Sequence, residues 1–236
     1  MTRRLFRQCV LALLALTLSA CAMLEQLDTA RDGGADNEES RIAAGLREAL
    51  RVGTERTVDR THREDGYLAN ERIRIPLPEQ FQSAASALRR VGLDDSLDDL
   101  ELAMNRAAEQ AAGEALDVFA DSISRMRPAD VYSVFDGGPD AATRYLRADS
   151  AEELQQRYQP VVAARLEAVQ GYDHYRDIAT AWNRLPLVRP LEVDLDRYVT
   201  EQALDGLFTL LAEEEQRIRE DPVARTTALL RDIFGE

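Results

Sequence analysis

The chain has 236 residues, 43 aspartates and glutamates against 29 basic residues, and a net charge of −14 at pH 7. An acidic protein repels nucleic acid and anionic head groups, which excludes both as partners held by electrostatic attraction. All 29 basic residues are arginine, which excludes Schiff-base lysines, P-loop lysines and Ser–Lys dyads.

The N-terminus has the three parts of a cleaved lipoprotein signal. A basic head with three arginines precedes an apolar run at 9–18, which is shorter than the roughly 20 residues of a membrane-spanning helix. The run ends in Leu-Ser-Ala-Cys at 18–21, the bacterial lipobox pattern. We expect residues 1–20 to be a signal peptide and Cys21 to carry the lipid (thioether and palmitate-type acyl chains). The alternative is an ordinary signal peptide with a chance cysteine.

Lipidation defines where the chain is expected to reside. Cleavage removes three positive charges and no negative ones, which lowers the net charge from −14 to −17. The membrane is therefore contacted through the N-terminal lipid, because several acyl chains anchor a protein stably. Ala22 replaces the aspartate that retains lipoproteins in the inner membrane, so we expect a periplasm-facing position on the inner leaflet of the outer membrane. Residues 21–39 form the lipidated cysteine and a flexible acidic tether with a reach of about 25 Å.

From Ser40 onward the apolar residues recur at helical spacing almost everywhere. The exception in the first half is 62–79, where Ile73-Arg-Ile-Pro-Leu-Pro78 alternates and contains two prolines. This stretch is expected to be an extended segment or an edge strand. The helices expected in this half cover 42–58, 79–91, 95–126 with a possible kink at Gly113, and a short stretch from Pro128 to the glycines at 137–138.

The second half is also predicted to be helical. We expect a small helix at 143–146, and a helix that a Ser150–Glu153 capping box opens and Gly171 ends. The later elements are a helix at 172–184, an extended link at 185–190, a long helix capped by Asp194 or Asp196 that runs to Glu220, and a last helix from Asp221-Pro222 to Phe234 with Gly235 as its stop. No 20–50-residue repeat is found, which argues against a solenoid. The predicted fold is a single all-α domain at 40–236, a compact orthogonal bundle of eight or nine helices on the lipidated tether.

The two histidines indicate no catalytic or metal site. His62 lies at the start of a charged loop, and the position three residues before His174 is glycine, so the Glu-x-x-His pattern of di-iron bundles is absent. The mature chain has no thiol. We therefore expect no catalytic triad, no zinc site, no metal and no cofactor.

The first polar island lies on the long helix predicted from Asp95. Asn105, Arg106 and Glu109 share one side of it at helical spacing. Leu102 and Leu116 continue the same side, so this face is partly apolar and not a fully solvated surface.

The second polar island is Glu213-Glu214-Glu215. Two neighbouring apolar stripes of the 196–220 helix include Glu214 and Glu215, so at least one of these glutamates is expected to point inward, where a carboxylate needs a partner. Arg225 and Thr226, in the segment after this helix, complete the candidate set.

Three interpretations of these islands remain open. In the first, Arg106 and Arg225 neutralise the glutamates in a structural salt-bridge network, with Glu109, Glu214 or Glu215 as the partner of Arg106. In the second, the islands form a polar interior pocket that binds a small ligand. In the third, a glutamate pair performs acid–base catalysis. A buried pair would make Arg106→Ala cost about 3–5 kcal/mol, whereas an exposed pair is worth about 0–1 kcal/mol.

Six stretches resemble a family of small bacterial lipoproteins known as domain of unknown function 4197. They are Ile75–Pro78, Met104–Glu109, Tyr198–Glu201, Ala203–Phe208, Ala212–Glu215 and Asp221–Thr227. The resemblance extends from about residue 42 to residue 234, and the complete lack of lysine is the one departure from it. It implies the fold and the lipoprotein character and carries no activity.

The function expected from the sequence is that of a cell-envelope lipoprotein with a non-enzymatic periplasmic binding or scaffolding domain, whose partner is a small ligand or an envelope protein. The alternative is a hydrolase or lyase that uses Glu214 or Glu109 as acid or base. A buried, dry glutamate–arginine network favours the first, and an open cleft with the glutamates at its floor favours the second.

Overall fold

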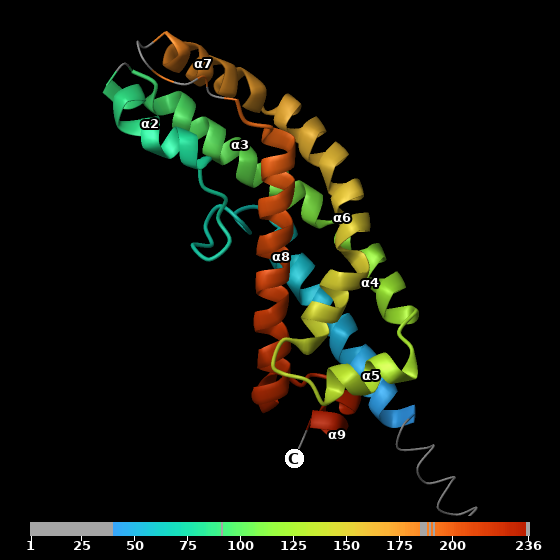
Figure 1. The fold of residues 1–236 in the computed structure, drawn as a ribbon. Coiled ribbons are helices and arrows are strands. Elements are labelled where there is room, and N and C mark those ends of the chain that lie inside the picture. Colours follow the sequence, from blue (N-terminus) through green and yellow to red (C-terminus); the bar gives the residue numbers. More distant parts are fainter. Residues whose placement is uncertain (1–39, 91, 185–187, 189, 191, 235–236) are drawn as a thin grey trace, which may run out of the picture. The chain divides into compact units, whose positions relative to one another are not determined.

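The computed structural model of the chain describes residues 40–90, 92–184, 188, 190 and 192–234 (Figure 1). Within these residues the protein is all-helical, with nine α-helices and no strand, as predicted. The chain divides into two units between Ala44 and Gly45, and the packing described below is that of the Gly45–Glu236 unit. Among the described helices, none combines the length and the apolar character needed to cross a membrane.

The first helix covers residues 40–62 and is followed by an irregular stretch at 63–78, here called the 63–78 segment. The remaining helices are α2 (Glu79–Arg90), α3 (Asp94–Ala112), α4 (Ala115–Ser124), α5 (Pro128–Phe135), α6 (Ala141–Ala168), α7 (Gly171–Asn183), α8 (Leu195–Glu220), the short 3-10 helix η1 (Pro222–Ala224) and α9 (Ala228–Phe234).

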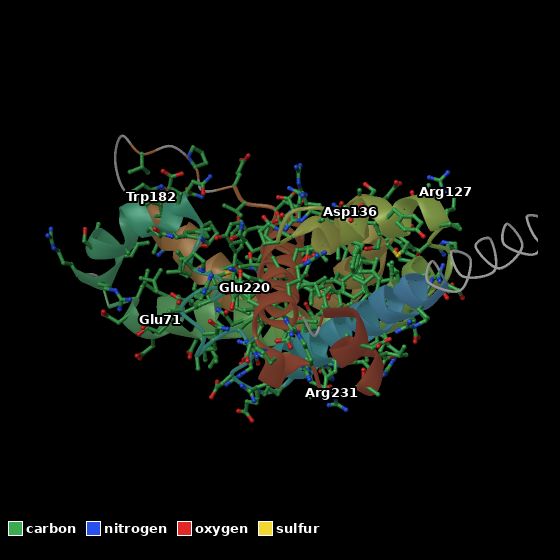
Figure 2. The ribbon with its side chains drawn as sticks, turned by 90° about the horizontal axis from the view of Figure 1, so that it is seen from below. Glu71, Arg127, Asp136, Trp182, Glu220 and Arg231 are labelled. Atoms are coloured by element: carbon green, nitrogen blue, oxygen red, sulfur yellow. The ribbon has the colours of Figure 1, made fainter. Side chains whose placement is uncertain are left out.

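Three long helices form the core. α8 packs against α3 and α6, and α6 also contacts α3, α4, α5 and α7 (Figure 1). Alanines line the buried face of α3 at Ala103, Ala107 and Ala111, and such small side chains let neighbouring helices approach closely. Leu207 of α8 is fully buried, and burial of one such side chain stabilises the fold by about 1.5–3 kcal/mol. Figure 2 shows Trp182 of α7 and Arg127, next to α5, at opposite ends of this arrangement.

Several predicted helix boundaries are confirmed. Pro128 opens α5 at its first turn, and the Asp194 side chain accepts a hydrogen bond from the Arg197 amide at the start of α8. The predicted kink at Gly113 is a break, because α3 ends at Ala112 and α4 begins at Ala115. A Cβ at position 113 would lie 3.1 Å from the imidazole of His62, so the glycine also permits a close approach.

Other boundary predictions are wrong. Ser150 opens no helix: it is buried inside the continuous helix α6, and its hydroxyl donates to the Leu146 carbonyl at 2.5 Å. The serine pattern predicts an N-cap, but this serine is buried and its hydroxyl bonds the carbonyl four residues earlier, as happens for serines inside a helix. Gly171 starts α7, and Gln170 takes the left-handed conformation (φ 59°) between the two helices.

The remaining predictions concern the segment ends. Asp221 caps η1 through the Val223 amide, and a separate helix, α9, follows, so Asp221-Pro222 does not open one continuous last helix. The proline-containing stretch 73–78 forms no strand. Most of the predicted link at 185–190, and Gly235, lie outside the described residues.

Candidate functional site

The first polar island attaches the 63–78 segment to α3. The Asn105 side chain accepts from the Ile75 amide at 2.9 Å and donates to the Ile75 carbonyl at 2.8 Å, so it pairs with that backbone as a neighbouring strand would. One oxygen of Glu109 accepts from the amides of Tyr67 at 3.1 Å and Leu68 at 3.2 Å. Both α3 side chains are buried, and both satisfy backbone groups that have no helical partner.

Arg106 completes this island with an ion pair. Its guanidinium lies 2.7 Å from the second oxygen of Glu109 and 2.8 Å from Asp65, with Glu64 at 3.4 Å. The Glu109 side chain is 4% exposed and that of Arg106 is 20% exposed. Glu109 is therefore the carboxylate partner of Arg106, and the remaining contacts of this arginine lie in the 63–78 segment.

α8 holds the other side of the 63–78 segment. The Tyr67 hydroxyl donates to the Ala203 carbonyl at 2.6 Å, and the Tyr198 hydroxyl donates to the Pro76 carbonyl at 2.9 Å. A Cβ at Gly206 would lie 2.8 Å from the Tyr67 ring and 3.1 Å from Ile73, so only glycine fits there without rearrangement. Burial raises the pKa of the Tyr67 hydroxyl well above its ordinary value, and the Glu109 carboxylate raises it further.

Glu215 caps a helix to which it does not belong. Its carboxylate accepts from the amides of Ala142 at 3.0 Å and Thr143 at 2.8 Å and from the Thr143 hydroxyl at 2.8 Å. These two amides are in the first turn of α6, and Asp140 at the N-cap position makes no side-chain capping bond. The Glu215 carboxylate from α8 thus acts as the N-cap of α6 and complements the positive end of the α6 dipole.

Arg219 neutralises Glu215. Its guanidinium lies 3.0 Å from the carboxylate and also donates to the carbonyls of Val134 and Phe135 at 2.9 and 3.3 Å. Those carbonyls belong to the last turn of α5, so one Glu–Arg pair of α8 connects the end of α5 to the start of α6.

Glu214 faces the first helix. Its side chain is 1% exposed and pairs with Arg56 at 2.7 Å and Arg217 at 3.1 Å. Arg56 also donates to the Ala224 carbonyl at 3.2 Å and the Thr226 hydroxyl at 2.9 Å. The expectation of at least one inward glutamate is confirmed, since Glu214 and Glu215 are both buried.

The remaining candidates have separate roles. Glu213 is partly exposed and pairs with Arg72 at 3.0 Å. Arg225 pairs with neither island: it donates to the carbonyls of Ile218 at 3.1 Å and Arg219 at 2.8 Å. The expectation that Arg225 neutralises a glutamate is therefore wrong. Its cationic group instead satisfies carbonyls near the negative end of α8, where a positive charge is favourable.

The structure places the two islands in two different networks. Asn105, Arg106 and Glu109 bind the 63–78 segment, whereas Glu214, Glu215, Arg225 and Thr226 connect α8 to the first helix, to α6 and to η1. Sequence reasoning missed Arg56 and Arg219. Arg56 follows Gly53 by three positions on the stripe that contains Leu46 and Ala49, so the reasoning that identified Glu214 could have found it.

His62 was also missed as a structural contact. One of its ring nitrogens lies 2.9 Å from the Glu109 carbonyl, near the end of α3, and the ring packs over Gly113. In the part of the chain that the structure describes, no group of three or more His, Cys, Asp or Glu side chains is arranged to hold a metal ion.

The space next to the buried glutamates is small. A cavity of about 20 Å³ lies between the first helix, α8 and the start of α6, with Gly53, Ile218 and Glu215 in its lining. One water needs about 10–15 Å³ of such space, so the cavity has room for about one water molecule. The Glu215 oxygens beside it already accept from two amides, a hydroxyl and an arginine, so the helices at this end of the bundle are closely packed around satisfied polar groups.

One comparison with known proteins decides the family. The family model described as "Protein of unknown function (DUF4197)" matches residues 36–235. The chain belongs to this family. No curated protein and no solved structure matches the chain significantly. The DUF4197 match extends over all described helices and both polar networks.

Proposed function

We propose that this DUF4197 protein is a cell-envelope lipoprotein whose helical domain is a non-enzymatic binding or scaffolding module. The basic head, the apolar run and the Leu-Ser-Ala-Cys pattern support the lipid anchor at Cys21 and the removal of residues 1–20. Ala22 supports retention on the inner leaflet of the outer membrane, facing the periplasm.

One observation carries the non-enzymatic part of the proposal. Two of the three buried glutamates are hydrogen-bonded within the fold through both oxygens: Glu109 by two amides and Arg106, and Glu215 by two amides, a hydroxyl and Arg219. Glu214 accepts a hydrogen bond from Arg56 through Oε1, whereas its Oε2 lies 3.1 Å from the Arg217 guanidinium and accepts no hydrogen bond from the described residues. A general acid or base needs an oxygen within hydrogen-bond reach of a substrate in an accessible site. Glu109 instead satisfies loop amides, Glu215 satisfies the start of α6, and Glu214 is paired with two arginines. These contacts favour a structural role over the hydrolase or lyase alternative.

The anchor is tested by detergent phase partition. The wild-type chain should enter the detergent phase, and Cys21→Ser, which cannot be lipidated, should either stay uncleaved or be released in soluble form. Equal partition of both proteins into the aqueous phase would show that the chain is no lipoprotein. Fractionation of the two membranes then tests the position assigned from Ala22.

The structural role of the glutamates is tested by stability. Glu214→Gln and Glu215→Gln should lower the free energy of unfolding, because each leaves buried cationic or amide groups poorly paired. A gain in stability from either change would indicate a strained functional carboxylate and overturn the non-enzymatic assignment. Native mass spectrometry of the protein extracted from its own envelope identifies any ligand or protein bound in fixed stoichiometry.

A further inference from the structure

Two apolar side chains face solvent at the end of the bundle where η1 and α9 lie. Val223 of η1 is 84% exposed and Leu229 of α9 is 39% exposed. Among the described residues, two other large apolar side chains are exposed, Leu102 of α3 at 38% and Leu116 of α4 at 37%. Single exposed apolar residues are common on proteins without any binding role, so exposure alone does not identify a contact surface.

The fold holds both of these side chains outward. Asp221 caps η1 through the Val223 amide at 2.9 Å, and the next residue, Ala224, is buried in an apolar cluster with the first helix. Leu230 is buried in the same cluster. Its neighbour Leu229 therefore points away from the cluster, since successive residues of a helix point about 100° apart. The exposure of the apolar pair thus results from how η1 and α9 are packed.

The first helix enters the Gly45–Glu236 unit at this same end. Leu46 and Ala49 line the small cavity together with Phe234 of α9. Figure 1 shows α9 at the lower end of the bundle, and Figure 2 views the protein from that end. The lipid expected at Cys21 is joined to the first helix by a tether with a reach of about 25 Å. The exposed apolar pair therefore lies at the end of the domain to which the anchor is attached.

We propose that the η1–α9 end is the face with which the domain rests on the membrane that holds its lipid. Val223 and Leu229 enter the boundary between the head groups and the acyl chains, where both side chains leave water. The tether keeps this end at a high local concentration beside the bilayer, so a contact that is weak by itself is still formed. This inference rests on the lipid anchor of the proposed function and adds an orientation of the domain.

The charges at this end do not attract the bilayer by themselves. The exposed charged residues here are two arginines and three acids: Arg217, Arg231, Glu220, Asp221 and Asp232. An acidic protein is not drawn to anionic head groups, so the contact depends on the anchor and on the apolar pair. A chain without the lipid, Cys21→Ser, should therefore stay in solution when it is mixed with vesicles.

The test uses single thiols, because the expected mature chain has no free thiol of its own. Val223→Cys and Leu229→Cys each carry one fluorophore, and Leu102→Cys and Leu116→Cys are the matched controls on other helices. Each lipidated full-length variant is reconstituted in phosphatidylethanolamine–phosphatidylglycerol vesicles that carry a short-range quencher on the acyl chains. Quenching should be at least about twofold stronger at positions 223 and 229 than at the controls, because side chains at the head-group boundary reach the quencher.

A second comparison separates contact from proximity, because a tether at this end brings every nearby probe closer to the lipid. The probe is placed at the exposed Ala228 as Ala228→Cys, and Val223→Asp/Leu229→Asp removes the apolar pair. Quenching at position 228 should then fall to the level of the controls. Leu102→Asp/Leu116→Asp introduces the same charges elsewhere and should leave this quenching unchanged. Circular dichroism compares the helix content of both variants with that of wild type, since substitutions at exposed sites should preserve the fold.

Three results would overturn the contact. They are equal quenching at all four thiol positions, no quenching of a protein that floats with the vesicles, and quenching at position 228 that persists in Val223→Asp/Leu229→Asp. A wild-type chain that does not float with the vesicles refutes the lipid anchor, and the contact with it. Flotation thus tests the proposed function, whereas quenching of the floated protein tests the orientation alone.

Discussion

Glu109 is one of the candidate site residues whose loss is expected to destabilise the fold strongly. Glu109→Ala removes the acceptor of two amides, Tyr67 and Leu68, and the partner of Arg106. Each buried amide left without an acceptor costs about 1–3 kcal/mol. Arg106 keeps its pair with Asp65 and is 20% exposed, so leaving it without Glu109 adds little to the loss of unfolding free energy. We expect a total of about 3–5 kcal/mol, the range for breaking a buried pair.

Arg106→Ala is the second single variant of a double-mutant cycle with Glu109→Ala. The sequence alone predicts the full 3–5 kcal/mol for this change, but the structure shows that Glu109 keeps its two amide bonds when the arginine is lost. We therefore expect about 1–3 kcal/mol, and a coupling energy with Glu109→Ala of about 0.5–3 kcal/mol, as is usual for residues in contact.

Urea unfolding of residues 21–236 with Cys21→Ser measures these losses, provided that the denaturant slope stays constant between variants. Arg157→Ala is the matched control, because its pair with Glu153 has side chains 41% and 39% exposed and should cost less than about 0.5 kcal/mol. A loss below about 0.5 kcal/mol for Glu109→Ala would show that the 63–78 segment is not held through this carboxylate, and the description of a structural network would be wrong.

Further predictions use the same urea assay and circular dichroism. Gly53→Ala should stabilise the domain by about 1 kcal/mol, because alanine favours a helix interior and the new Cβ would lie at an ordinary 3.8 Å from Ile218. Gly206→Ala should instead destabilise the domain, because that Cβ would lie 2.8 Å from the Tyr67 ring. A change of the unfolding free energy in the same direction for both variants would contradict the packing described. Burial raises the pKa of Tyr67 and Tyr158, so the folded state holds these protons longer, and above about pH 10 stability should fall by about 1.4 kcal/mol per pH unit for each tyrosine. A flat profile from pH 9 to 11.5 would speak against their burial. Circular dichroism should show helix well above half, and a sheet-dominated spectrum is the opposing result.

The helices could be predicted because most of them bury one apolar stripe. The stripe through Leu97, Leu100, Met104 and Ala107 has the period of a helix, and all four side chains are buried in α3. Chain breaks at Pro128 and Gly113 also follow from local backbone chemistry. Ser150 shows where such reasoning fails: its capping pattern is genuine, but burial against neighbouring helices keeps α6 continuous through it.

The partners of the charged residues could not be predicted in the same way. The stripe pattern marks Glu214 as buried, but its partner Arg56 is 158 residues away in the sequence, and the amides that Glu109 accepts from are 41 and 42 residues away. Helical periodicity gives the face on which a side chain lies and contains no information on which element covers that face. Pairs within one helix are different, because spacing alone could propose them: Arg106 with Glu109, Arg217 with Glu214 and Arg219 with Glu215 lie three or four positions apart.

The buried carboxylates determine how irregular chain is held between regular helices. Glu109 and Asn105 supply acceptors and donors to a segment without secondary structure, and Glu215 supplies the N-cap that Asp140 does not provide. An apolar side chain at any of these positions would leave buried amides unpaired, at a cost of about 1–3 kcal/mol each. Polar residues on apolar helix stripes are therefore a requirement of this fold.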